Sequence, residues 1–216
     1  MADMLDVIIR RHAGPVAKRA GVARKGRYLR IQGDSAHVLL HFDNFILDQA
    51  RTIFEVDYGV IPLPYWDFSH RARPGGVPST PDRSGLFLHT YLMPPDRWSY
   101  RPDESGTPVF KRRWTFDNAT GLDECGAALA ERLDAEAFPR MRWLLDTDNV
   151  LSEVRRRTFT TPCAMSSDQH REVVLTVDHA DPAHLERLLA EADASPAEDF
   201  EEWVRARMAP RTPTGN

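Results

Sequence analysis

Residues 36–45 and 52–61 place a hydrophobic residue at almost every second position, and this alternation predicts two β-strands, each with one apolar face. The pattern is typical of an antiparallel sheet that packs helices on one side. The apolar face comprises Val38, Leu40, Phe42, Phe54, Val56 and Tyr58, and the opposite face comprises His37, Leu39, His41, Asp43, Glu55 and Asp57.

The rest of the chain predicts further strands around this pair and helices at both ends. Hydrophobic residues recur at helical spacing in residues 3–13, and Gly14-Pro15 is expected to end or kink that helix. Residues 62–85 are rich in Pro and Gly and are predicted to form a long loop, while residues 171–179 fit either a strand or a helix. Further strands are predicted at 27–32, 86–93 and 110–117, and further helices at 120–138, from Pro139 onward, at 181–193 and at 195–208.

These elements together predict one α+β domain over residues 1–209. Its antiparallel sheet has about five strands, with the N-terminal helix and the C-terminal helices packed on one face. Residues 210–216 are predicted to form a disordered tail.

Composition narrows the class of protein. Hydrophobic residues make up 42% of the chain, and no apolar run approaches the roughly 18 residues that a membrane-spanning helix needs. The first residues carry acids where a secretory signal carries bases, so we expect a soluble, cytoplasmic protein. Cys125 and Cys163 lie far apart without a CxxC motif, which predicts free thiols in a reducing compartment.

Charge is distributed unevenly along the chain. Residues 1–30 carry a net charge of +6 and residues 164–216 a net charge of −6. A basic segment can mark a nucleic-acid surface, but this one lacks the interleaved aromatic residues that stack on bases, so no nucleic-acid partner is predicted. Only three of the 28 basic residues are Lys, a bias typical of GC-rich bacterial genomes.

The polar face of the two strands is the first candidate site. His41 beside Asp43, Glu55 or Asp57 can hold a general base, so these four residues are the predicted catalytic group. His37 and His41 lie about 13 Å apart along a strand and cannot share a metal ion. His41 and Asp43, with Glu55 and Asp57 facing them, are close enough to share one, but no metal or cofactor is predicted. We expect this face to be accessible and partly covered by the loop at 62–85. The alternative is a solvated sheet surface.

A basic turn and several aromatic residues supply the candidate ligand-binding residues. Gly26 lies between cations and can present backbone amides and positive charge to a phosphate or carboxylate; alternatively, it only serves the turn. Trp66 in the loop fits either a recognition surface or a plug of the core. The predicted ligand-binding residues are Lys25, Arg27, His37, Trp66, His89 and Tyr91.

Two of these segments also carry a family resemblance. The basic turn and the third strand resemble motifs of a bacterial family, domain of unknown function 4304, and the helix "FPRMRWLL" at 138–145 is similar to a later helix of that family. The resemblance covers about residues 3–145 and implies an α+β fold without a settled activity. Val22 and Asp57 depart from the family pattern, which usually has Phe and Asn there. The matching positions are Gly21, Arg24, Lys25, Gly26, Arg27, Phe54, Val56 and Gly59.

Two classes of function follow from the sequence. The first is a binding or adaptor protein, with an immunity-like or accessory role, that recognises a protein or ligand partner through the polar face and the Pro-rich loop. The second is a small-molecule enzyme of specialised metabolism that uses the His, Asp and Glu side chains of the same face. The chain has no GxSxG, P-loop, GxGxxG or HExxH motif, which favours the first class.

Overall fold

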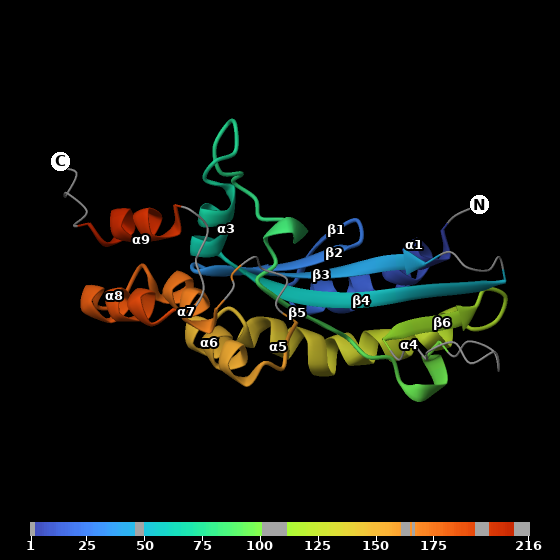
Figure 1. Cartoon of the computed structure of the whole chain (residues 1–216). Helices are drawn as coiled ribbons and strands as arrows, with labels where there is room; N and C mark the ends of the chain where they lie inside the picture. The colour runs from blue at the N-terminus through green and yellow to red at the C-terminus, as the bar shows by residue number, and fades with distance from the viewer. Residues whose placement is uncertain are drawn as a thin grey trace.

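One antiparallel sheet organises the molecule (Figure 1). The computed structural model describes residues 3–45, 50–100, 112–160, 165, 167–192 and 199–209, and the predicted tail at 210–216 lies outside them. Within these ranges six strands are present, and the predicted α+β class with helices toward both ends of the chain is confirmed. The strands are β1 (Ala23–Lys25), β2 (Tyr28–Gln32), β3 (Ala36–Phe45), β4 (Arg51–Pro62), β5 (Leu88–Tyr91) and β6 (Arg113–Asp117).

The long pair β3–β4 is the centre of the sheet. Its register runs from Ala36 opposite Pro62 to Phe45 opposite Ile53, as the alternation predicted. On the other edge of β4, β5 and β6 lie one after the other and pair with its second and first halves. Because the side-chain period of a strand is two, this register sends alternate residues of all neighbouring strands to the same face.

Strand β1 was not predicted. It forms a hairpin with β2, in which Lys25 pairs with Tyr28 and only Gly26 and Arg27 make the turn. Gly26 has φ of +59°, a conformation that L side chains rarely adopt, so the glycine serves the turn geometry. The basic segment is therefore the edge of the sheet.

The helices differ from the prediction at both prolines. Gly14-Pro15 does not end the first helix, and Pro139 does not begin a new one, because a π-helical turn precedes each proline and the helix continues. Residues 171–179 are mainly helical, and α6 was not predicted. The helical segments are α1 (Met4–Ile8), η1 (Ile9–Ala13), α2 (Gly14–Arg19), α3 (Leu63–His70), η2 (Arg83–Gly85), η3 (Asp96–Trp98), α4 (Leu122–Arg132), η4 (Leu133–Ala137), α5 (Phe138–Trp143), α6 (Thr147–Arg156), α7 (Asp168–Thr176), α8 (Pro182–Glu191) and α9 (Phe200–Met208).

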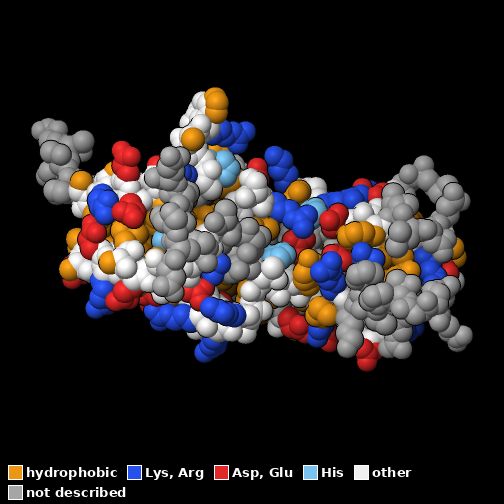
Figure 2. All heavy atoms as spheres, in the orientation of Figure 1, with side chains coloured by type: hydrophobic (Ala, Val, Ile, Leu, Met, Phe, Trp, Pro, Cys, Tyr) orange, Lys and Arg blue, Asp and Glu red, His pale blue; other side chains and the backbone are white. Residues whose placement is uncertain are grey.

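The segment at 62–85 is only partly a loop. It begins with α3, which leaves the end of β4, and it returns to the sheet through η2. Helices α7 to α9 lie near α3 at this end of the molecule, and charged side chains of both signs are interspersed over the face seen in Figure 2. In the described ranges no helix has the length and apolarity needed to cross a membrane.

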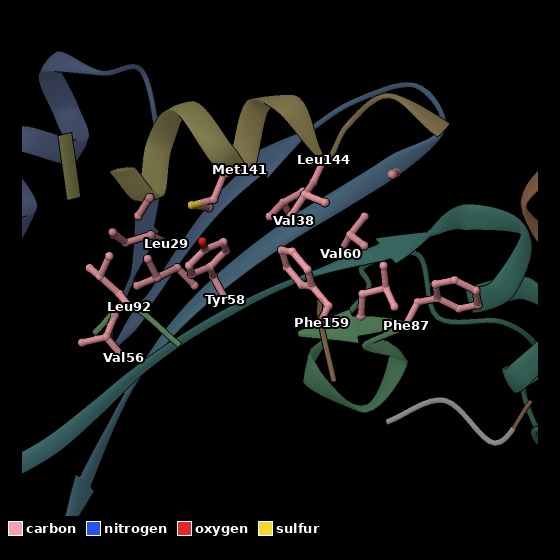
Figure 3. Packing of buried hydrophobic residues seen from close by; sticks show 14 of the residues in the cluster. Leu29, Val38, Val56, Tyr58, Val60, Phe87, Leu92, Met141, Leu144 and Phe159 are labelled. Carbon is pink, nitrogen blue, oxygen red and sulfur yellow. The ribbon is translucent and has the colours of Figure 1, made fainter. Parts of the chain in front are cut away.

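The apolar face of the sheet is covered by helices. Met141 and Leu144, at the end of α5, point toward Val38, Tyr58 and Val60 on the strands (Figure 3). All six residues predicted for this face are buried, with Leu40, Phe42, Phe54 and Val56 at 0% exposure. The same buried cluster extends from Leu5 in α1 to Val204 in α9. The opposite face is the one that carries the polar residues.

Candidate functional site

The predicted catalytic residues lie together on the polar face of the sheet. His41 pairs with Asp57 across β3 and β4, and Asp43 pairs with Glu55 two positions further along. Tyr91 continues the first row, because it is the partner of Asp57 on β5. The sequence pattern therefore brought these five side chains to one face, as the register shows.

His37 and His89 lie on the same face but not beside these acids. His37 pairs with Ile61, and His89 pairs with Gly59 and bridges to the backbone of Thr160. Burial, and then the nearby Arg30, lower the pKa of His37, so its neutral form is favoured. Its Nδ1 has no hydrogen-bond partner in the described structure, in keeping with an uncharged ring.

The expectation of an accessible acidic face is wrong for two of its members. Asp57 is 2% exposed and Glu55 is 5% exposed. Arg83, the first residue of η2, donates to Asp57 at 3.2 Å and lies 3.7 Å from Asp43. Burying an unpaired carboxylate is costly, so the loop that covers these acids also has to supply a cation.

Glu55 is neutralised in the same way from the other side. Arg112 and Arg113 donate to one of its oxygens at 2.9 Å and 3.2 Å. The hydrogen bond to Glu55 raises the pKa of Arg112, whose guanidinium also lies 4.6 Å from the centre of the Tyr91 ring. Tyr91 is thus part of a packed ion-pair cluster.

The arrangement around His41 does not suit an Asp–His general base. Arg83 lies 3.0 Å from Nδ1 of His41, and a guanidinium can only donate, so this nitrogen accepts the hydrogen bond. Asp57 lies 3.5 Å from the same nitrogen. A carboxylate that orients a basic imidazole would need a proton on that nitrogen. The cluster is therefore better suited to hold the loop on the sheet than to move protons.

A groove of about 740 Å³ lies beside this cluster, over β1, β2 and β3. The polar face of the sheet forms the floor of the groove, and Thr80 and Asp82, in the segment before η2, form a wall. Most of its strand residues alternate onto this face, in agreement with the register. The residues that line the groove are Ala23, Arg24, Lys25, Gly26, Arg27, Tyr28, Arg30, Gln32, Leu39, His41, Thr80 and Asp82.

The two cations predicted to bind ligand have different roles. Arg27 donates to Asp6 at 2.8 Å and also binds Asp3, so it ties the hairpin to the N-terminal helix. The hydrogen bond to Asp6 raises the pKa of Arg27. Lys25 is exposed, and no carboxylate in the described ranges pairs with it. Of the two, only Lys25 remains free to meet a ligand charge.

Trp66 is a structural residue. Its side chain packs with Leu39, Ile61 and Leu86 in a small cluster on the polar side of the sheet, and it is only 3% exposed. The indole Nε1 donates to the carbonyl of Pro78 at 2.8 Å. Trp66 thus holds the segment around Pro78 against the sheet. Because it is buried, the structure does not support its assignment as a ligand-binding residue.

Metal and thiol chemistry gain no support from the described residues. Among them, no three His, Cys, Asp or Glu side chains gather in a way that could hold a metal ion. Cys125 is fully buried, and burial raises the pKa of its thiol to about 12, so it is not a nucleophile at neutral pH. Cys163 lies outside the described residues.

Sequence reasoning missed Arg83, Arg112 and Tyr28. Arg83 follows an irregular loop, and nothing in its local sequence indicates that it reaches two strands. Tyr28 had a detectable signal, because it alternates with Arg30 and Gln32 on a predicted strand. No protein-family model matches the chain, and no curated protein or solved structure is significantly similar to it. The resemblance to domain of unknown function 4304 therefore stays a prediction.

Proposed function

We propose that this chain is a binding protein whose ligand enters the groove over β1, β2 and β3. The observation that carries the proposal is the composition of the groove. Its floor is the polar face of the sheet, and Thr80 and Asp82 of the Pro-rich segment form its other wall. A volume of about 740 Å³ falls in the range of small-molecule sites.

The neighbouring ion pairs support binding rather than catalysis. Asp57 and Glu55 are engaged by arginines and do not line the groove. A small-molecule enzyme is the second candidate, because His41 both lines the groove and contacts Asp57. In that case His41 would act on a ligand through the ring nitrogen that does not face Arg83.

Blocking the groove tests the proposal. Thr80 is exposed and lines the groove, whereas Val77 is exposed in the same segment and does not line it. We expect a small-molecule library, screened by nuclear magnetic resonance on the full chain, to yield ligands that bind the wild type and Val77→Trp saturably. Thr80→Trp should lose them, because the indole fills the groove.

Two outcomes would change the assignment. Ligands that bind all three proteins equally place the binding site elsewhere and refute the groove. Conversion of a bound ligand to a new product, lost in His41→Gln while binding is kept, identifies an enzyme. Circular dichroism of each variant controls for folding.

A further inference from the structure

We propose that the ligand of the groove is a planar organic anion, whose ring stacks beside Tyr28 and whose acidic group meets Lys25 and Arg30. The inference rests on the proposed function and names the class of ligand. Aromatic carboxylates and nucleotides share this chemistry. Three features of the groove carry it: an aromatic platform, an excess of cations and a limited volume.

The aromatic platform is formed by Tyr28 and His41, which face each other across β2 and β3. Their ring centroids lie 4.5 Å apart with an interplanar angle of 26°, so the two rings are stacked. Tyr28 nevertheless remains 40% exposed, so a ligand in the groove can reach its ring. A stacked ring is held in place before a ligand arrives, so little conformational entropy is lost on binding.

The platform lies among uncompensated cations. Lys25 and Arg30 line the groove from the polar face, and no carboxylate in the described part of the chain forms an ion pair with either of them. Arg24 also borders the groove, but it pairs with Leu29, so its side chain lies on the opposite face, beside Gly14. Arg30 donates to the backbone carbonyl of Pro81 at 2.6 Å, which fixes its position but leaves its charge unbalanced. Figure 2 shows Lys and Arg side chains near the upper edge of the sheet, at the place of β1 and β2 in Figure 1.

The acid of the groove is already engaged. Asp82 accepts hydrogen bonds from the backbone N–H and the hydroxyl of Ser84, at 2.9 Å and 2.6 Å. Desolvation raises the pKa of Asp82, but the two bonds to Ser84, together with the nearby His70 and Arg73, lower it more, so the net pKa is lowered. The carboxylate faces the start of η2. Two cations, Lys25 and Arg30, therefore face the groove with one carboxylate that is already hydrogen-bonded, so a negatively charged ligand is favoured.

Matched probes separate the contribution of the planar ring to the affinity from that of the negative charge. We would titrate the isotope-labelled full chain with 2-naphthoate and adenosine 5′-monophosphate, which present a planar ring with a carboxylate or a phosphate. The controls are 2-naphthamide, which is planar and neutral, and cyclohexanecarboxylate, which is anionic and not planar. Chemical shifts of residues in β1 to β3 report binding. We expect saturable binding of at least one planar anion, at least about tenfold tighter than either control.

Two variants assign the interactions, and a third is their control. Tyr28→Leu keeps an apolar side chain but removes the ring, and Lys25→Glu reverses one charge of the groove. Each substitution should lower the affinity for the planar anion by about tenfold. Lys18→Glu makes the same charge change on an exposed residue of α2 that does not line the groove, and should leave the affinity within about twofold.

The outcomes distinguish the ligand class from the function. If 2-naphthamide or cyclohexanecarboxylate binds as tightly as the planar anions, the groove is a binding site and the proposed class is wrong. If both planar anions fail to saturate at millimolar concentration while library ligands still depend on Thr80, the class is again refuted. If no ligand of any kind depends on Thr80 or Tyr28, both the inference and the proposed function fail.

Discussion

The ion pair between Asp57 of β4 and Arg83 of η2 holds the end of the 62–85 segment on the sheet. The carboxylate of Asp57 is 2% exposed, whereas the side chain of its partner Arg83 is 40% exposed. Removing Arg83 should therefore affect stability differently from removing the charge of Asp57. A buried carboxylate without a cation loses its solvation and gains nothing, but a half-exposed guanidinium can return to water.

This asymmetry predicts unequal effects of two substitutions. Arg83→Met should lower the free energy of unfolding by about 1–3 kcal/mol at neutral pH, because it leaves Asp57 buried with His41 as its one remaining ion-pair partner in the described structure. Asp57→Asn should cost less, since it removes the charge. Urea denaturation measures both. The double variant should recover part of the loss, and a larger effect of Asp57→Asn would refute the argument.

At this scale the sequence predicted which face a residue occupies but not which residue it contacts. Alternation is a local property, so it placed His41 and Asp57 on one face correctly. The cation that neutralises Asp57 comes from an irregular loop, which has no periodicity to interpret. The burial of Trp66 similarly depends on a carbonyl, that of Pro78, twelve residues away.

The helical elements show why proline is an incomplete stop signal. A proline ring clashes with the carbonyl four residues earlier and offers no N–H, which normally ends a helix. Here the N–H of Gly14 bonds to Ile9 and that of Phe138 to Leu133, both five residues back, directly before Pro15 and Pro139. The wider turn accommodates each ring, and this adjustment has no simple sequence signature.

Close approach between η1 and α4 leads to a second prediction. A Cβ at Gly126 would lie 2.2 Å from the His12 ring, so Gly126→Ala should destabilise the fold by about 1–3 kcal/mol despite the better helix propensity of Ala. Adding His12→Ala should remove that penalty. Thermal unfolding of the two single variants and the double variant gives their coupling. Strictly additive effects would show that the contact does not account for the loss.

Acid stability is a property of the whole molecule to which His170 contributes. The ring lies between α7 and α9, 5.2 Å from the Phe200 ring, with 1% exposure and no partner for Nδ1 in the described structure. Burial lowers its pKa below the ordinary 6.5, more than Glu201 raises it. Below pH 6.5, His170 therefore binds a proton in the unfolded chain but not in the folded protein. The free energy of unfolding consequently falls as the pH falls.

His170→Phe tests this contribution. The variant keeps a ring of similar size and removes the titratable group, so it should lose less stability than the wild type between about pH 7 and pH 5. Urea denaturation across this range gives the slope. At about pH 8 both rings are uncharged, and the difference there reports packing alone. An unchanged slope would show that His170 does not cause the acid sensitivity.

The order of the elements along the chain has a consequence for how the protein is made. The strands from β1 to β6 leave the ribosome before α4 and α5, whose side chains, with Met141 and Leu144 among them, cover the apolar face in the finished fold. Translation proceeds at about 5–20 residues per second, so this delay is on the order of seconds. During that interval a nascent chain presents the part of the apolar face that Met141 and Leu144 later cover, with Val38 and Tyr58 exposed, and chaperones bind apolar surface of this kind.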